Sequence, residues 1–521
     1  MSLARNTLVQ ASLTLTSRVL GFTRDVVLAA RIGAGPIGDA WATALMFPNL
    51  FRRIFAEGAF AQAFVPSYSR TLEEHGAEAA RLVAEEAMRV LFAATAALTL
   101  LAQFAMPWIM LVIHGGQADD AENFSLAILL TRITMPYLTC MSLAALLSGV
   151  LNSAGRFILS AGAPTIMNIC LILSGFVSYA PATVAKAAAI AVFIAGILQA
   201  LVLYWGVRRQ KLRLSLLGWP RMTPRVKHIL MLAIPGTIAA SGTQINILVS
   251  QLLASYEIGA KTWLYYADRL YQLPLGLVGV AVGVAILPQL SRAARRDDGA
   301  DSQRMMDEGV GLAMALTLPA AAALFFAPAF FIEGIFTRGA FTTFDASQSG
   351  LALIHYAWGV PAFVLIKVLA PGFFAREDTK TPMRFALISV AINTVLGAGL
   401  FFLFSSRGDP GFPGLAIATS VAAWANALLL GFGLAKRGWY RPGSALVSRL
   451  IRAGIASLAM CGALWFALLH VELIRVQIYD SKLMATLVVI FAGMLAYALA
   501  ALIFGAVRPR EIIRALKRSA S

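Results

Sequence analysis

The sequence predicts an all-α polytopic membrane protein with about fourteen transmembrane helices. Of its 521 residues, 59% are hydrophobic and 13% are charged, and the mean hydropathy is +0.75, whereas roughly a quarter of the residues of a soluble domain are charged. Apolar runs long enough to cross a bilayer, which takes about 20 residues, recur along the whole chain. Between these runs no polar stretch is long enough to form a soluble domain.

Short polar breaks separate the apolar runs and define the predicted helices in chain order. Each run is long enough for one crossing at 1.5 Å of rise per residue. The fourteen segments cover residues 10–33, 38–66, 82–113, 124–151, 157–179, 184–207, 229–255, 262–290, 308–337, 349–374, 383–405, 413–435, 448–471 and 484–507.

The basic residues alternate between the connections and predict the orientation. One set of connections is rich in Arg and Lys, above all the stretch from Arg208 to Lys227. The alternate set contains few cations, among them Lys261, and carries acidic residues such as Asp119 and Asp120. Because cytoplasmic loops of membrane proteins are enriched in Lys and Arg, the rich set and both termini are expected in the cytoplasm.

An internal repeat divides the predicted helices into two lobes. Trp41, Pro66 and Ser69 recur at one offset, and Pro136 and Asn168 at a nearly identical one, as Trp263, Pro288, Ser291, Pro361 and Asn393. The offset spans six predicted helices, an even number, so the repeats are expected to be parallel. The expected domains are an N-terminal lobe (1–207), a cytoplasmic linker (208–228), a C-terminal lobe (229–435), and two added helices with a basic tail (436–521).

The linker combines cations with Leu214, Leu216, Leu217 and Trp219. This composition fits an amphipathic segment that lies in the membrane interface. It fits a plain positively charged cytoplasmic loop equally well. The sequence leaves both interpretations open.

Charged residues inside the apolar segments are the candidate functional residues. An Arg at the centre of a membrane helix costs roughly 2.5–3.5 kcal/mol, so such residues mark functional sites by default. They are Arg18, Arg24, Asp39, Arg52 and Glu57 in the first two segments, and Asp268, Arg269 and Lys367 in the second lobe. Together they predict a cationic cavity for an anionic substrate, and the planar Arg fork suits a diphosphate. The alternative is that these arginines pair with Asp25, Asp39 and Glu57, or extend to an interface.

Several classes of function are disfavoured. The three cysteines and five histidines are scattered without metal-ligand spacing, so no metal site and no cofactor are expected. The net charge of +17 lies in short clusters between apolar runs, which argues against nucleic acid as a partner. Adjacent acidic pairs such as Glu73 and Glu74 point about 100° apart on a helix, which disfavours a membrane enzyme such as a glycosyltransferase.

Four motifs resemble the MviN/MurJ family, the bacterial lipid II flippases of the multidrug/oligosaccharidyl-lipid/polysaccharide exporter superfamily. They are T-S-R-V-L-G-F-T-R-D (16–25), F-P-N-L-F-R-R-I-F-A-E-G-A-F-A-Q-A-F-V-P (47–66), Y-Y-A-D-R-L (265–270) and K-V-L-A-P-G-F-F-A-R-E-D-T-K-T-P (367–382). The resemblance covers essentially the whole chain. It implies two six-helix lobes around a cationic cavity and a groove on the last two helices for the polyprenyl tail. Gln272 stands where some members have a Glu.

The resemblance also implies function, location and partners. The expected activity is translocation of lipid II, an undecaprenyl-diphosphate-linked disaccharide peptide, from the cytoplasmic to the periplasmic leaflet of the bacterial inner membrane by alternating access. Family cavity positions match at Arg18, Arg24, Asp39, Arg52, Glu57, Asp268, Arg269 and Lys367. The expected partners are this lipid, membrane lipids and proteins of wall synthesis or division, with the chain as a monomer. The energy source, a membrane potential or an ion gradient, stays open.

Two other transport functions share this fold. One is a cation-coupled exporter of small amphipathic compounds, which would favour an acidic cavity, whereas the predicted cavity is basic. The other is a flippase for another polyprenyl-diphosphate-linked glycan, which would need the same cations.

Overall fold

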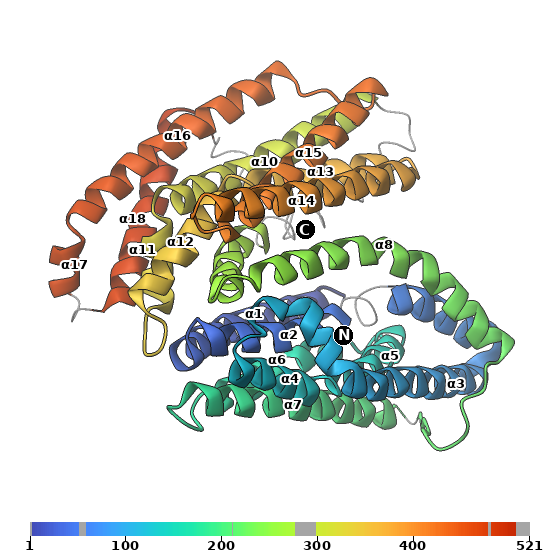
Figure 1. The fold of residues 1–521 in the computed structure, drawn as a ribbon. Coiled ribbons are helices and arrows are strands. Elements are labelled where there is room, and N and C mark those ends of the chain that lie inside the picture. Colours follow the sequence, from blue (N-terminus) through green and yellow to red (C-terminus); the bar gives the residue numbers. More distant parts are fainter. Residues whose placement is uncertain (1–2, 52–58, 211, 277–298, 478–480, 507–521) are drawn as a thin grey trace. The chain divides into compact units, whose positions relative to one another are not determined.

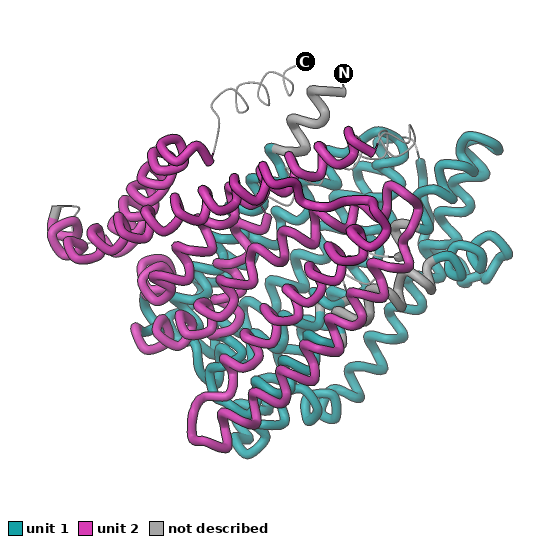
Figure 2. The backbone as a smooth tube through the Cα atoms, turned by 90° about the horizontal axis from the view of Figure 1, so that it is seen from above, with its two compact units in different colours: residues 1–262, 338–342 teal, residues 263–337, 343–521 magenta. Residues whose placement is uncertain are grey.

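The computed structural model describes residues 3–51, 59–210, 212–276, 299–477 and 481–506, and the regular elements of these ranges are all helical (Figure 1). Two compact units divide these elements (Figure 2). Unit 1 comprises residues 1–262 and 338–342, and unit 2 comprises residues 263–337 and 343–521. The predicted lobe boundary at the linker remains a prediction, while the compact units divide at Thr262.

In its described residues, unit 1 contains eight α-helices and one 3-10 turn that lie wholly within it. They are α1 (Leu3–Ile32), α2 (Pro36–Phe51), α3 (Ala59–Ile113), η2 (Gly115–Gln117), α4 (Ala121–Thr134), α5 (Tyr137–Ser153), α6 (Phe157–Ser174), α7 (Pro181–Arg209) and α8 (Pro224–Ala254). A further helix begins in this unit at residue 260 and is described to residue 276, with residues 263–276 in unit 2. Within the unit, α1 packs on α6, α2 on α4, and α3 on both α5 and α8.

Unit 2 contains the remaining helices. They are α10 (Gly299–Phe326), α11 (Pro328–Phe336), α12 (Thr343–Ala357), α13 (Val360–Phe374), α14 (Lys380–Ser406), α15 (Phe412–Lys436), α16 (Ser444–Leu469), α17 (Val471–Gln477) and α18 (Lys482–Ile503). Here α14 and α13 pack on α15, and α10 packs on α13 and α16. The last long helices, α16 and α18, pack against each other.

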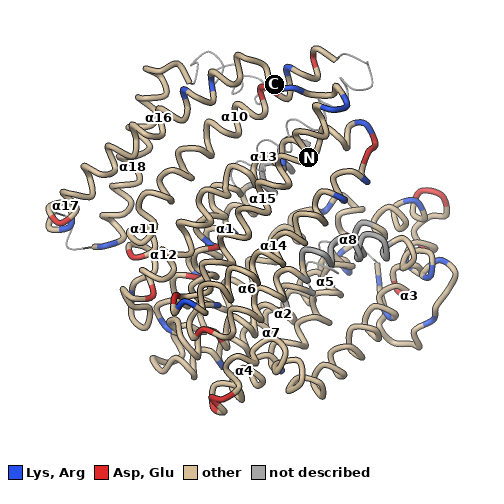
Figure 3. The backbone as a smooth tube through the Cα atoms, turned by 45° about the horizontal axis from the view of Figure 1, so that its top comes forward, with Lys and Arg blue, Asp and Glu red and all other residues tan. Residues whose placement is uncertain are grey.

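Ten helical segments of the described ranges are long and apolar enough to cross a membrane. Lys, Arg, Asp and Glu lie mostly at the ends of helices and in the connections, while the helix middles carry other residues (Figure 3). The chain is therefore an all-helical, multi-pass membrane protein, as the composition predicted.

Proline divides three of the predicted segments into paired helices, and one of them, 308–337, forms the end of α10 and all of α11, with Pro328 in the first turn of α11. The segment 124–151 forms α4 and α5, which meet at Pro136, and the segment 349–374 forms α12 and α13, with Pro361 in the first turn of α13. Proline is tolerated in a first turn because its missing N–H has no helical partner there. The two prolines that recur in the sequence thus occupy similar breaks in the two units.

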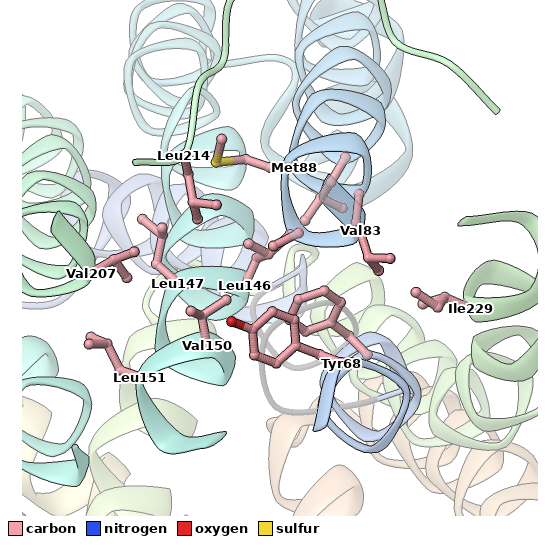
Figure 4. Close-up of a cluster of buried hydrophobic side chains, with 14 of the residues drawn as sticks. Tyr68, Val83, Met88, Leu146, Leu147, Val150, Leu151, Val207, Leu214 and Ile229 are labelled. Atoms are coloured by element: carbon pink, nitrogen blue, oxygen red, sulfur yellow. The ribbon is translucent and has the colours of Figure 1, made fainter. Parts of the chain in front are cut away.

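A tightly packed core joins α3, α5, α7 and α8 in unit 1. Tyr68 and Phe64 are fully buried and stack at 5.6 Å between ring centroids. Leu146, Leu147 and Val150 of α5 face this region (Figure 4). The polar segment predicted between residues 66 and 82 is helical as well, with a single break at Gly76, whose φ is 80°.

Candidate functional site

The C-terminal half of α1 presents a buried ion pair. Arg24 and Asp25 are 7% and 4% exposed, and the Arg24 Nη2 and Nε atoms donate to Asp25 Oδ1 at 2.7 and 3.0 Å. The third donor, Nη1, reaches Asn168 Oδ1 of α6 at 3.0 Å. The Asn168 amide nitrogen in turn donates to the Ser17 carbonyl oxygen at 2.9 Å. Both ends of the planar guanidinium are therefore engaged, and α1 and α6 are joined by it.

Arg18 lies on the same helix but is exposed. Arg18 and Arg24 are six positions apart, which corresponds to about 240° of net rotation at about 100° per residue, so the two side chains leave α1 in different directions. The helix is continuous through Gly21. Arg18 is accessible to a ligand, whereas Arg24 is packed against α6.

Asp39 in the first turn of α2 is fully buried. Its Oδ1 accepts from the Thr262 N–H at 3.0 Å and the Thr262 hydroxyl at 2.8 Å. Its Oδ2 accepts from the Gly259 N–H at 2.7 Å and from Gln117 Nε2 at 2.9 Å. Four donors saturate both oxygens of a carboxylate. Asp39 thereby fixes the start of the helix at residue 260 to α2 and η2.

A buried lysine lies beside this carboxylate. Lys261 is fully buried, and its Nζ donates to Thr43 Oγ1 at 2.9 Å and to the Ile113 carbonyl oxygen at 2.9 Å. A third contact of 2.8 Å reaches His114 Nδ1. An ammonium group can only donate, so Nδ1 of His114 is the acceptor and carries no proton.

The neighbouring amides of Gln117 and Asn123 extend the contacts of Asp39. Gln117 donates to Asp39, so its Oε1 is free to accept from Asn123 Nδ2, at 2.9 Å. His114 follows the last residue of α3, in the connection between two candidate spans. Burial and the Lys261 charge lower the pKa of His114 to about 3. We term Asp39, Thr43, His114, Gln117, Asn123 and Lys261 the buried polar network.

In unit 2, Asp268 and Arg269 are half-buried on one helix. The Arg269 guanidinium lies 4.5 Å from the Tyr265 ring centroid and donates to the Tyr265 hydroxyl at 3.0 Å. Gln272 donates to Asp268. Lys367 is exposed on α13. Tyr265 therefore orients one candidate cation, and Gln272 occupies one oxygen of the adjacent carboxylate.

Two of the sequence-predicted site residues, Arg52 and Glu57, lie outside the described residues. The structure brings Arg24 together with Asp25, and Asp268 together with Gln272. Sequence reasoning missed the buried polar network, because Lys261 was assigned to a loop and His114 to no site. The only signal was a His directly after an apolar run and a Lys directly before one.

The sequence matches the family described as "Lipid II flippase MurJ" over residues 28–502. A curated relative from Rhizobium meliloti (strain 1021), described as "Probable lipid II flippase MurJ", is 40% identical and aligns with 100% of this chain and 97% of its own length. A relative from Burkholderia cenocepacia, described as "Lipid II flippase MurJ", is 35% identical over 95% of this chain and 96% of its own.

Solved structures show the same relationship. The structure titled "Lipid II flippase MurJ, inward closed conformation" is 26% identical and superimposes with a TM-score of 0.78, covering 97% of this chain and 100% of that one. An inward-facing multidrug transporter of the MATE family has a TM-score of 0.64 at 16% identity, over 84% of this chain and 98% of its own, and so shares the fold. The chain belongs to the lipid II flippase MurJ family, a family of transporters and not of enzymes.

Proposed function

We propose that this protein translocates lipid II from the cytoplasmic to the periplasmic leaflet of the bacterial inner membrane by alternating access. Family membership over nearly the whole chain supports the lipid substrate. The observation that supports diphosphate binding is the presence of two arginines on α1, of which Arg18 is exposed and Arg24 is buried. A diphosphate needs cations with several donors, and Arg supplies them in a fixed plane.

The proposed substrate-binding residues are the eight charged positions of the apolar segments: Arg18, Arg24, Arg52, Arg269, Lys367, Asp39, Glu57 and Asp268. The exposed Arg18 and Lys367 are assigned to direct contact with the diphosphate. Asp39 has four donors of its own and is assigned a supporting role. Arg24, which bonds Asp25 and Asn168, can contact substrate only if α1 and α6 separate during transport.

The proposed architecture has fourteen transmembrane helices. Two six-helix parallel repeats form lobes at 1–207 and 229–435, joined by a cytoplasmic linker at 208–228 and enclosing a cationic cavity. Similar proline breaks at Pro136 and Pro361 support the repeat. Residues 436–521 add helices 13 and 14 and a basic cytoplasmic tail. Exposed apolar side chains on these helices, such as Phe466 and Phe491, suit a polyprenyl tail.

Depletion of the protein in cells tests this function. With the protein depleted, we expect the lipid-linked wall precursor to accumulate in the cytoplasmic leaflet, where a periplasmic enzyme that cleaves its headgroup cannot reach it. Restoring the wild-type chain should return the precursor to the periplasmic leaflet. If the leaflet distribution is unchanged on depletion while efflux of amphipathic cations falls, the protein is an exporter and the proposal is wrong.

A further inference from the structure

The connection between α7 and α8, together with the adjoining helix ends, presents a surface of exposed apolar and basic side chains. Its apolar tip consists of Leu216, Leu217, Trp219 and Met222, with exposed fractions of 44%, 87%, 86% and 59%. Six exposed cations flank the tip: Arg208, Arg209, Arg213, Arg221, Arg225 and Lys227. The sequence from Arg208 to Lys227 contains no Asp or Glu. We term these ten residues the linker surface.

Buried contacts with α3 fix the backbone of this connection. Glu85 is 5% exposed, and its Oε1 accepts from the Ser215 N–H at 3.1 Å. Arg89 Nε donates to the Ser215 carbonyl oxygen at 3.1 Å. Both polar backbone groups of Ser215 are thus bound by one Glu and one Arg of the same helix. The connection is non-helical at this point, so side-chain partners replace the bonds a helix would supply.

Contacts on both sides of Ser215 extend this attachment. The Leu214 side chain is 2% exposed and points into the core of unit 1 near Met88 and Leu147 (Figure 4). The Tyr204 hydroxyl donates to the Leu214 carbonyl oxygen at 3.0 Å, and the Thr223 hydroxyl donates to Glu86 at 2.7 Å. The segment is therefore anchored before and after the tip, and the tip side chains project outward from an ordered backbone.

The length of α7 indicates the depth in the membrane at which the linker surface lies. The 29 residues of α7 span about 44 Å at 1.5 Å per residue, which matches a bilayer of roughly 40–45 Å with its headgroups. The ends of α7 consequently lie at headgroup depth. At that end, the Arg209 guanidinium stacks 4.0 Å from the centroid of the exposed Trp205 ring. Trp and Arg are side chains that concentrate at membrane interfaces.

We propose that the linker surface binds anionic phospholipid headgroups of the membrane leaflet next to it. The tip residues enter the interface while the flanking arginines contact lipid phosphates, and the connection itself contributes no acidic residue that would offset their charge. Each cation near an anionic membrane surface raises affinity by about fivefold. Because the backbone is ordered by Glu85 and Arg89, little conformational entropy is lost on binding. This proposal is independent of the transported substrate.

The test uses the full-length protein in nanodiscs of phosphatidylcholine with and without phosphatidylglycerol. Each lipid in turn is brominated in the upper acyl chain, which quenches a nearby Trp. Subtracting the signal of Trp219→Phe isolates Trp219 from the other tryptophans. We expect stronger quenching of Trp219 by brominated phosphatidylglycerol than by brominated phosphatidylcholine. The triple variant Arg213→Gln/Arg221→Gln/Arg225→Gln should reduce this preference by about tenfold or more.

A matched variant controls for net charge. Lys380→Gln/Arg384→Gln/Arg441→Gln removes three exposed cations elsewhere and should leave the Trp219 preference unchanged. If both triple variants lose the Trp219 preference for phosphatidylglycerol equally, a general effect of net charge explains the result and the proposal is wrong. Equal quenching by the two lipids would overturn the anionic specificity. Trp219 that is quenched by aqueous iodide but by neither lipid would show that the surface faces water or a soluble partner.

Discussion

Lys261 and His114 are 147 positions apart in the sequence, yet the Lys261 ammonium lies 2.8 Å from His114 Nδ1 in the interior of unit 1. The same lysine bonds Thr43 of α2 and the last carbonyl of α3. Asp39, in the same network, accepts a hydrogen bond from Gln117, whose side-chain oxygen in turn accepts one from Asn123. A buried cation and a buried anion thus secure residues 259–262 to the first helices of the chain.

Removing the buried cation should destabilise the protein. Lys261→Met keeps roughly the same side-chain length but removes the contacts of the ammonium with Thr43, Ile113 and His114, and each buried acceptor left unsatisfied costs roughly 1–3 kcal/mol. We expect a lower midpoint of thermal unfolding in detergent. A wild-type midpoint for Lys261→Met would disprove this role.

The network should also make stability depend on pH. The pKa of His114 is lowered from an ordinary 6.5 to about 3 in the folded protein, so the unfolded chain binds a proton more readily than the folded one. His114 therefore contributes stability above pH 6.5 that is lost as the pH falls toward 3. His114→Gln, which cannot titrate, should show a flatter decline in unfolding midpoint over this range. Parallel curves for the two proteins would contradict the assignment.

Arg24 and Arg18 should respond differently to lysine. The Arg24 guanidinium bonds Asp25 and Asn168 at once, a geometry that one ammonium cannot reproduce, so Arg24→Lys should lower both transport and the unfolding midpoint. Arg18 is exposed, and Arg18→Lys should retain the unfolding midpoint. If Arg18 binds the diphosphate through its planar fork, Arg18→Lys also loses transport. Wild-type transport by both variants would show that these two positions need only a positive charge and not the planar guanidinium.

Arg269→Ala should abolish support of growth while the protein still inserts in normal amounts. Tyr265 stacks on this guanidinium and accepts its hydrogen bond, so Tyr265→Phe is the matched variant: it keeps the ring and loses only the hydroxyl. We expect a smaller defect for Tyr265→Phe. Full complementation by Arg269→Ala would remove this residue from the site.

The topology predicted from the alternating basic connections can be tested with cysteines introduced singly. Asp119 and Arg213 are both exposed, which makes them accessible to a membrane-impermeant thiol reagent. We expect Asp119→Cys to be labelled in intact cells and Arg213→Cys only after the membrane is opened. Labelling of both positions from the same side would contradict the predicted fourteen-helix topology.

Local sequence properties predicted the helices well. The apolar run 448–471 corresponds to α16, Ser444–Leu469, because a crossing leaves a continuous signal about 20 residues long. The breaks at Pro136 and Pro361 were missed as helix boundaries, since a proline can also lie inside a bent membrane helix. Such a break depends on neighbouring helices that can bond the freed backbone groups.

The candidate site was only partly predictable. Charge inside apolar segments identified Arg24, but its bond to Asn168 joins residues 144 positions apart and follows from the packing of α1 on α6. Lys261 was assigned to a loop because it precedes an apolar run. Its burial depends on acceptors from α2 and α3, which no local pattern reveals.

The central claim is tested most directly by purified protein in liposomes with lipid II placed in one leaflet. The transferred fraction is measured with an impermeant enzyme that acts on the headgroup in the opposite leaflet. The account predicts that wild-type protein accelerates transfer and that Arg18→Ala and Lys367→Ala, both exposed positions, reduce it while folding normally. Transfer no faster than in protein-free liposomes, under any imposed potential or ion gradient, would contradict the account.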